Sequence, residues 1–408
     1  MNVAVFVPDA HASACVAVIR SLGRAGYNVH TGSPDPNAIG LRSRFANHSV
    51  ICPAFNDPLF VDWMRAYVIR HDIKMIVPTN GVLVALMPAF KEFKHLLPVS
   101  PDENTLVDCF SKIKVVDRFI KADPLLGLMN NHPQSTLVDL SKPLDTNVLP
   151  RSQYGYYIKC ESPRCLNLDS TSSFAYEENG VKALASLVLM SSNWKFALVQ
   201  EAVSGFQVGV SVLMDNGKAL AVSCVRDCHP YPHSRGTMSL RESCWFADIA
   251  DDTIKRLSFL NWQGCAMGEY RLDVQTQTFN LIEINFRYWQ YLHLDLWAGM
   301  DYPLMQAQWF LDGKSQFQNK PKLGVICRDT WPGEVAQQVN EWRRSDLKFH
   351  LKIRGLLMFF VRSCNPQIHS DFNFPGDRTL YIYRFINYLK SDIKSVSKKL
   401  SRYFKLLF

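Results

Sequence analysis

The stretch 264–290 constrains the fold of this 408-residue chain more than any other part of it. It holds two runs of alternating apolar residues, 267–274 and 279–285, with four polar residues between them. Alternation with a period of two is typical of strands that bury one face. Because the polar connection is short, the sequence predicts two antiparallel strands joined by a turn.

Ionisable or amide side chains fall at every second position of both runs, so each set shares one face of its strand. The sets are Glu269, Arg271 and Asp273 in the first run, and Glu283, Asn285 and Arg287 in and just after the second. Mg²⁺ prefers a few carboxylate or amide oxygens and bridges to nucleotide phosphates, which guanidinium groups also bind. The alternative is a solvated sheet face with cross-strand ion pairs. Glu283 interrupts an otherwise apolar run, which favours the metal site because a buried charge needs a partner or a metal.

Strands and helices alternate in the first 80 residues, which predicts an open α/β sheet. The expected strands are 2–8, 27–31, 48–52 and 75–77, with helices near 13–25 and 58–71. No Gly-x-Gly-x-x-Gly follows the first strand, so the fingerprint of dinucleotide binding is absent.

Two lysine positions differ in their surroundings. Lys159 lies in the aromatic and β-branched run 156–160, where a buried ammonium group would need an anionic partner. Lys112 and Lys114 fall in a helix expected from 104 to 126, and lysines on helices are usually solvated. The residues alone therefore favour a role for Lys159 and an exposed position for the helix pair.

The segment Glu283-Ile-Asn-Phe-Arg287, followed by Ala-Gly-Met-Asp-Tyr-Pro at 298–303, resembles the C-terminal half of ATP-grasp ligases. The resemblance is strongest to the carboxylate–amine ligase branch that is often found with surface-polysaccharide genes, and it covers about 1–313. It implies an α/β chain, α+β in the ATP-grasp part. The expected parts are a Rossmann-like domain, a nucleotide- and metal-binding ATP-grasp domain, a C-terminal extension and a basic amphipathic helix, at 1–104, 105–313, 314–384 and 385–408.

The resemblance also implies an activity. The enzyme would use ATP and Mg²⁺, with Mn²⁺ as an alternative metal, to join a carboxylate to an amine through an acyl-phosphate. A sugar acid and an amino acid are the substrates that this branch suggests. Loops at 9–13 and 79–81 would help to hold the acceptor. A homodimer is one option for assembly, and no nucleic-acid partner is expected.

Site residues follow from the resemblance position by position. Glu283, Asn285 and either Glu269 or Asp273 would bind the metal. The phosphates would meet Arg287, Lys159 and Lys112, the last being a closer match than Lys114.

The strands expected within 196–214 would carry the adenine hinge. Gln200 or Glu201 would face the adenine amino group, Val203 would supply a backbone contact, and Gln207 would take the place of the ribose partner. Arg226, with Arg235, Gly236 and Ser239, would face the acyl-phosphate, and Arg271 completes the cationic set.

The loop after Lys159 departs from the family pattern. Residues 161–173 contain no glycine, although a glycine-rich loop usually closes over the phosphates. An ATP-binding protein without ligase turnover is therefore the second hypothesis. A glycosyltransferase is a third hypothesis. It would require a sugar-nucleotide site, and it would not account for the Glu-x-Asn pair.

Eleven cysteines without a CxxC pair favour a reducing compartment over a disulfide framework. The dense group Cys224, Cys228, His229 and His233 lacks the spacing of structural zinc sites. No basic, apolar leader begins the sequence and no apolar run is long enough to span a bilayer, so a cytoplasmic location is expected.

Charge is concentrated at the C-terminus. Six Lys or Arg and one Asp fall in the last twenty-one residues, while the whole chain carries +8. From residue 385 onward apolar residues recur at helical spacing, which predicts a basic amphipathic helix suited to the anionic inner face of a membrane. A helix that packs on its own domain is the competing interpretation.

Overall fold

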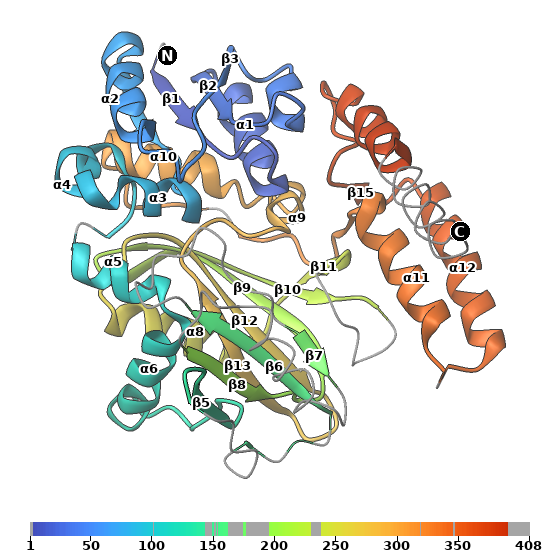
Figure 1. The fold of residues 1–408 in the computed structure, drawn as a ribbon. Helices are drawn as coiled ribbons and strands as arrows, with labels where there is room; N and C mark the ends of the chain where they lie inside the picture. Colours follow the sequence, from blue (N-terminus) through green and yellow to red (C-terminus); the bar gives the residue numbers. More distant parts are fainter. Residues whose placement is uncertain are drawn as a thin grey trace, which may run out of the picture.

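The structure is a computed structural model. It describes residues 3–100, 102–142, 149–150, 152, 154–161, 174–176, 196–229, 238–318, 320–345 and 347–390, with the backbone alone at 160–161 and 174–176. Three sheets and the helices that cover them form an N-terminal domain, a body beneath it and a group of C-terminal helices at one side (Figure 1). The loop 162–173, His233, Arg235, Gly236 and the tail 391–408 lie outside the described residues.

The N-terminal sheet is parallel, with the strand order β3-β2-β1-β4. Its strands are β1 (Ala4–Val7), β2 (Asn28–Ser33), β3 (His48–Ile51) and β4 (Ile73–Ile76). Val5, Phe6 and Val7 are fully buried, because helices cover both faces of the sheet. These helices include α1 (Ser13–Arg24), α2 (Phe60–His71), α3 (Asn80–Leu86) and α4 (Phe90–Phe93). The α/β expectation for this region is confirmed.

The helix expected from 104 to 126 is broken in two. α5 (Glu103–Phe110) ends before Ser111, which has extended backbone angles, and α6 (Lys112–Leu126) begins directly after it. The Ser111 hydroxyl accepts a hydrogen bond from the amide of Lys114 at 3.1 Å and so caps α6. The break places Lys112 at the first position of a helix rather than in its middle.

The central sheet has seven strands in the order β13-β12-β9-β10-β11-β14-β15. They are β9 (Phe206–Asp215), β10 (Lys218–Asp227), β11 (Leu240–Cys244), β12 (Gly264–Asp273), β13 (Thr278–Asn285), β14 (Ile326–Arg328) and β15 (Ile368–Ser370). The strand pair expected within 264–290 is present, as β12 and β13.

The two faces of the central sheet differ in what covers them. On the face we call the helix face, Val208, Val210 and Tyr270 pack with α8 (Ala247–Phe259). On the opposite face, which we call the cleft face, Leu213 and Met267 pack with α9 (Leu292–Trp297) and α10 (Tyr302–Asp312). α1 also contacts α9 and α10, which attaches the N-terminal domain to the cleft face.

A third sheet of four strands, in the order β5-β8-β6-β7, lies in front of β12 and β13 (Figure 1). Its strands are β5 (Ser135–Asp139), β6 (Tyr156–Glu161), β7 (Phe174–Tyr176) and β8 (Phe196–Glu201). Four residues, 202–205, connect β8 to β9, so the chain passes directly from this sheet into the central one.

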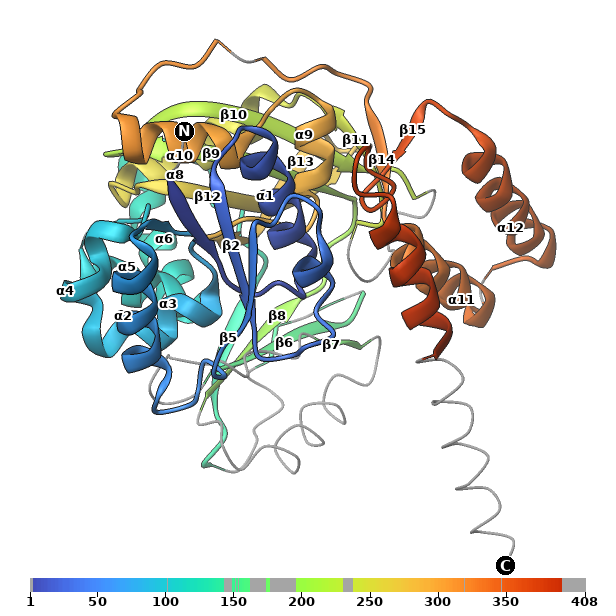
Figure 2. The ribbon, with the colours of Figure 1, turned by 90° about the horizontal axis from the view of Figure 1, so that it is seen from above.

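The C-terminal segment belongs to both larger parts of the molecule. β14 pairs with β11, and β15 pairs with β14, so this segment extends the central sheet. α11 (Val335–Arg343), α12 (Phe349–Cys364) and a helix at 379–390 stand beside the body (Figures 1 and 2). The sequence analysis predicted neither of the two short strands, β14 and β15. No helix among the described residues is long and apolar enough to cross a membrane.

Candidate nucleotide and metal site

A β-bulge in the β12–β13 hairpin sets up the site. Tyr270 pairs with Leu281 and Glu269 with Glu283, which leaves Ile282 as an extra residue between them. Regular pairing would have placed Ile282 opposite Glu269 and turned Glu283 to the helix face. The bulge instead brings the two glutamates directly opposite each other on the cleft face.

Two lysines from different elements converge on Glu283. The Nζ atom of Lys112, at the start of α6, donates to Glu283 Oε2 at 2.8 Å. The Nζ atom of Lys159, in β6, lies 3.6 Å from the same oxygen and donates to the carbonyl of Ile282 at 3.1 Å. The bulge therefore supplies Lys159 with a neutral partner as well as a charged one. The side chain of Lys159 is 4% exposed and that of Lys112 is 29% exposed.

The electrostatics of the pair of glutamates are unequal. Burial raises the pKa of Glu269, and the neighbouring Glu283 raises it further, against the opposing effect of Arg271 and the lysines. Burial also acts to raise the pKa of Glu283, but Lys112 and Lys159 outweigh it and hold that pKa below its ordinary value. Burial lowers the pKa of Lys159, and Glu283 opposes this change. The site thus has two facing carboxylates, only one of which lies close to the ammonium groups.

Asn285 and Arg287 continue the row from Glu283. The amide of Asn285 donates to Glu283 Oε1 at 3.0 Å, so its own Oδ1 faces the other way. Arg287 donates to that Oδ1 at 3.3 Å and to the carbonyl of Tyr288 at 2.8 Å. Among its neighbours is Asp9, at the end of β1: burial raises the pKa of Asp9, and Thr79, His11 and Arg287 oppose that rise. Arg287 therefore lies where the cleft face meets the loops that follow β1 and β4.

The structure separates the two acids that the sequence left as alternatives. Glu269 Oε1 accepts a hydrogen bond from Gln207 Nε2 at 2.5 Å and lies opposite Glu283. Asp273 lies four residues further along the strand, about 13 Å away. There it accepts from the Ser204 hydroxyl at 2.7 Å and from the amide of Gln275 at 2.9 Å. Glu269 is thus the acid that the fold brings to Glu283, whereas Asp273 braces the hairpin turn.

Arg271 and Gln207 are paired across β12 and β9 on the cleft face. Arg271 donates to the carbonyl of Gly205 at 3.2 Å. Gly205 has φ of 107°, and a Cβ there would collide with the carbonyl of Leu272, so the turn between β8 and β9 requires a glycine. This close approach positions the guanidinium group next to the turn.

The residues predicted from the resemblance to form an adenine hinge lie at the end of β8 and in the connection after it. Gln200 is 1% exposed, and its Nε2 donates to the Ser135 hydroxyl at 3.3 Å, while its buried Oε1 has no hydrogen-bond partner among the residues that the structure describes. Glu201 Oε1 accepts from the amide of Gln134 at 2.8 Å and so turns toward β5. Val203 lies in the connection itself. An unsatisfied, buried amide oxygen at this point is suited to accept a hydrogen bond from a ligand.

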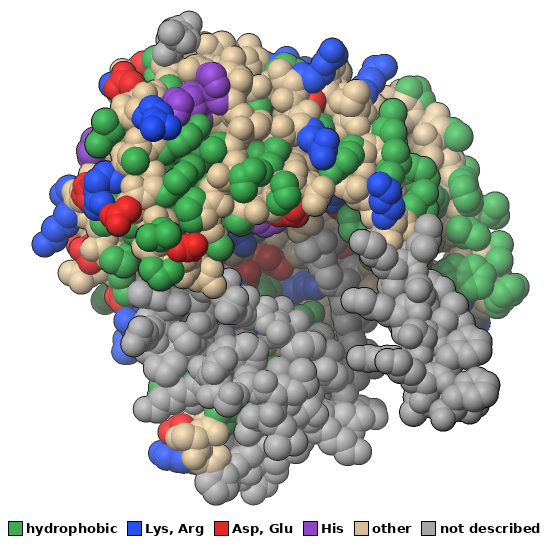
Figure 3. Space-filling view, turned by 45° about the horizontal axis from the view of Figure 1, so that its top comes forward, with side chains coloured by type: hydrophobic (Ala, Val, Ile, Leu, Met, Phe, Trp, Pro, Cys, Tyr) green, Lys and Arg blue, Asp and Glu red, His purple; other side chains and the backbone are tan. Residues whose placement is uncertain are grey.

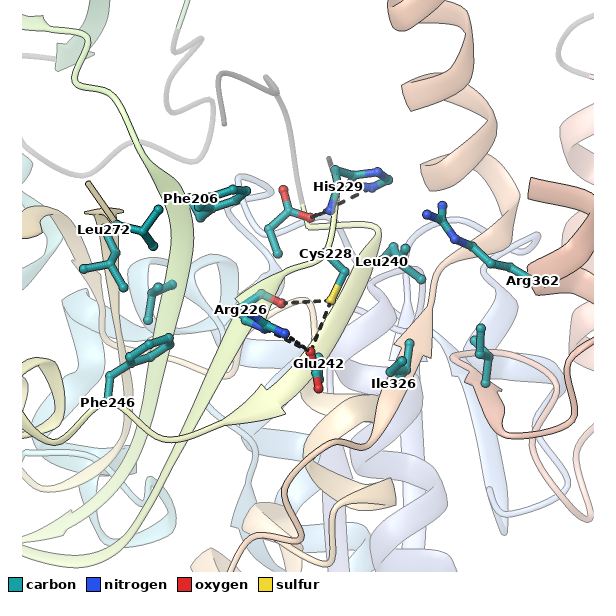
Figure 4. A pocket seen from close by; sticks show the side chains of 14 residues that line it. Phe206, Arg226, Cys228, His229, Leu240, Glu242, Phe246, Leu272, Ile326 and Arg362 are labelled. Atoms are coloured by element: carbon teal, nitrogen blue, oxygen red, sulfur yellow. Dashed lines mark hydrogen bonds and ion pairs between the residues drawn. The ribbon is translucent and has the colours of Figure 1, made fainter. Parts of the chain in front are cut away.

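The fold does not bring Arg226 to the glutamates. It pairs with Val208, which packs on the helix face, so its side chain points to the opposite side of the sheet from Glu269. There its Nε and Nη2 atoms donate to Glu242 Oε2 at 2.9 and 2.6 Å (Figure 4). Both residues line a pocket of about 440 Å³ that also includes Phe206, Leu272 and Arg362. The sequence resemblance assigned Arg226 to the site from its position in the chain alone. The alternation of side chains along β10 turns it to the other face of the sheet.

The donor set fits a magnesium ion better than a softer metal. Glu269 and Glu283 offer carboxylate oxygens and Asn285 an amide oxygen, and two facing carboxylates repel each other unless a cation or a proton lies between them. Among the residues that the structure describes, no group of three or more His, Cys, Asp and Glu could hold a metal ion by itself. A metal in this cleft would therefore need the amide of Asn285, substrate oxygens or water as further ligands.

The chain matches no family model and no curated protein. Solved structures do resemble it in fold. The ADP complex of an N5-carboxyaminoimidazole ribonucleotide synthetase aligns with a TM-score of 0.62 at 11% identity, over 89% of this chain and 97% of the other. An L-amino acid ligase from Bacillus licheniformis aligns at 0.53 and 16%, over 75% and 73%. A phosphoribosylglycinamide synthetase from Anaerococcus prevotii aligns at 0.54 and 14%, over 80% of each chain. The chain thus has the ATP-grasp fold that the sequence resemblance predicted.

Proposed function

We propose that this chain is an ATP-dependent carboxylate–amine ligase whose nucleotide and metal site is the cleft between β6, β12, β13 and the start of α6. The observation that carries the proposal is the convergence of Lys112 and Lys159 on Glu283, with Glu269 opposite and Asn285 beside it. The likeness in fold to a ligase and two synthetases supports the same chemistry.

The lysines are the phosphate-binding groups in this proposal. Both ammonium groups lie at one carboxylate oxygen of Glu283, so both can turn to phosphate oxygens of ATP without leaving the cleft. Lys159 lies next to the buried Ile158 in β6, and its ammonium group is already held by the carbonyl of Ile282, which limits the entropy lost on binding. Gln200 and the backbone of Val203 receive the adenine, and Gln207 lies nearest the ribose.

Glu269, Glu283 and Asn285 would hold Mg²⁺, which when bound neutralises charge on the phosphates of the nucleotide. The lysine and arginine side chains of the cleft bind and orient the reacting anions. A carboxylate oxygen of the first substrate forms a bond to the γ-phosphorus, and the bond to the bridging oxygen breaks to release ADP. The amine nitrogen then attacks the acyl carbon, phosphate leaves with the bonding electron pair, and the nitrogen loses a proton to give the amide.

Arg271 and Arg287 are the guanidinium groups placed to orient these anions. Arg287 lies between the cleft face and the loop of Asp9, so it is the group best placed for the carboxylate that is to be activated. Arg226 is left out of this set because it faces the other side of the sheet. The sequence resemblance to polysaccharide-linked ligases suggests a sugar acid as that carboxylate and an amino acid as the amine.

A screen of phosphate release tests this function. Uronic and other sugar acids would be combined with amino acids in the presence of MgATP, with mass spectrometry of any amide formed. We expect phosphate release that needs both substrates and that is lost in Glu283→Gln. ATP binding without release for any pair would instead favour the second hypothesis, a nucleotide-binding protein without turnover, which the glycine-free segment 161–173 motivates.

A further inference from the structure

α12 turns an apolar stripe to solvent. In this helix none of the side chains is buried. Phe349, Leu357, Phe360 and Val361 are 58–69% exposed. Together with Ile353 they recur at spacings of three and four residues, so they lie along one side of the helix. Figure 3 shows hydrophobic side chains gathered at the edge of the molecule where the C-terminal helices stand.

The other side of α12 is already occupied by its own protein. The guanidinium carbon of Arg328 lies 4.9 Å from the centre of the Phe359 ring. Gly355 faces α11 so closely that a Cβ would contact Glu341 Oε2 at 2.9 Å. Lys352 donates to the carbonyl of Trp342 at 2.9 Å. A helix that packs with one side and exposes large apolar groups on the other is missing a partner rather than a core.

The charges that α12 itself carries are of one sign, and the acidic Glu334 and Glu341 lie on its other side, next to Arg362 and Gly355. No acidic residue occurs from Lys348 to Ser370, whereas Lys348, Lys352, Arg354 and Arg362 do. Lys348 and Arg354 are exposed, and Arg354 follows Ile353 at the margin of the stripe. Apolar side chains flanked by cations are typical of helices that lie in the interface of an anionic membrane.

We propose that α12 docks on a bilayer surface that contains anionic phospholipid. Its apolar stripe enters the boundary between headgroups and acyl chains, and Lys348 and Arg354 meet the lipid phosphates. A second copy of the chain fits this surface less well, because a two-fold contact would set the same cations against one another. The proposal does not depend on the ligase activity, and it concerns a helix separate from the basic tail 391–408.

Co-sedimentation with vesicles tests the proposal without nucleotide. The full chain should bind vesicles of phosphatidylglycerol and phosphatidylcholine more tightly than vesicles of phosphatidylcholine alone. The double variant Leu357→Ser/Phe360→Ser should bind the anionic vesicles at least about tenfold more weakly, because two apolar groups no longer insert. Arg354→Glu should weaken binding to anionic vesicles only.

Matched controls come from the N-terminal domain. Leu59 and Ile69, at α2, are 66% and 76% exposed, and the double variant Leu59→Ser/Ile69→Ser should bind as the wild type does. A chain ending at Lys390 should retain most of the binding, which separates α12 from the tail. The proposal is overturned if Leu357→Ser/Phe360→Ser binds anionic vesicles as tightly as the wild type, or if the wild type binds neither vesicle. It is also overturned if that variant only converts a dimer to a monomer in analytical ultracentrifugation.

Discussion

Two clusters of acidic and basic side chains in this chain differ in how their charges are paired. One, the C-terminal clamp, consists of Arg20, Arg241, Asp371 and Asp377 and ties α1 to the segment after β15. Arg20 donates to Asp377 at 3.0 Å and to the carbonyl of Asp371 at 2.5 Å, and Arg241 pairs with Asp371. The side chains of both pairs are 0–1% exposed. The other cluster is the cleft, where Glu269 faces Glu283 and two lysines share one oxygen.

The clusters differ in how well their charges are matched. In the clamp each carboxylate meets a guanidinium group, which is the condition under which buried charges are tolerated. In the cleft like charges face each other, and the pKa of Glu269 rises as a result of burial and of Glu283. A mismatch of this kind lowers stability unless a ligand relieves it, so it marks a functional site more than a structural one.

The largest expected effect is on the clamp. Asp377→Ala leaves Arg20 buried without its carboxylate and removes the acceptor of the Ser43 hydroxyl. We expect the free energy of unfolding to fall by about 3–5 kcal/mol in urea titrations. Asp117→Ala is the control, because Asp117 pairs with Lys121 at the surface of α6, with 59% of its side chain exposed, and the expected loss is under about 1 kcal/mol. Equal losses in the two variants would refute the distinction between clamp and surface.

In the cleft, Lys159→Ala should weaken ATP binding about tenfold or more, because a charge-assisted contact is worth about 1.5–3 kcal/mol. Lys114→Ala is the matched control. Its side chain is 48% exposed and its Nζ lies 3.0 Å from Asp108, on another side of α6 from the cleft. Calorimetric titration with ATP measures both. Similar small effects would mean that Lys159 does not meet the nucleotide.

Ser111→Ala should have a smaller effect, of about 1 kcal/mol on stability, because it removes the cap of α6. Since Lys112 follows the cap directly, the affinity for ATP should fall with it by a few fold. Thr105→Ala, two turns away in α5, provides a comparison at a site that does not hold Lys112. Loss of stability without any change in ATP affinity would show that Lys112 does not need the break in the helix.

Glu269→Gln is expected to have the smallest effect on stability, and the direction of that effect follows from the raised pKa of Glu269. Since the folded protein raises the pKa of Glu269 above its ordinary value of 4.5, ionisation opposes folding as pH rises through the folded pKa. The variant should therefore be slightly more stable than the wild type at neutral pH, and the gain should shrink as pH falls toward 4.5. Thermal unfolding between pH 4 and pH 8 measures it. A loss of stability at neutral pH would indicate that Glu269 is a structural partner of Gln207.

Much of the fold was predictable because its patterns are local. The apolar runs predicted the parallel strands β1 to β4, and the alternation of apolar and polar residues predicted β12 and β13. The broken helix at Ser111 was not predicted, because serine occurs both inside helices and at their caps. β14 and β15 were also missed, since three residues each carry too little pattern to distinguish a strand from a loop.

The site was less predictable than the fold. Residue types and spacing suggested Glu269, Glu283, Asn285 and Lys159. Choosing Glu269 over Asp273 required knowledge of the bulge at Ile282. A bulge depends on how two strands pair, so it cannot be predicted from the sequence of one strand. Arg226 shows a second limit. Its position in the chain matched the family pattern, but that position could not reveal that β10 turns its side chain to the helix face.

The most direct test of the central claim compares two glutamates. Calorimetric titration of ATP, with and without Mg²⁺, would use the wild type, Glu283→Gln and Glu242→Gln, the last a carboxylate paired with Arg226 on the helix face. We predict that Mg²⁺ strengthens ATP binding in the wild type and in Glu242→Gln. In Glu283→Gln the effect of Mg²⁺ should vanish, while metal-free ATP binds as well or better because Lys112 and Lys159 are released. An undiminished effect of Mg²⁺ in Glu283→Gln would contradict the assignment of the cleft as the nucleotide and metal site.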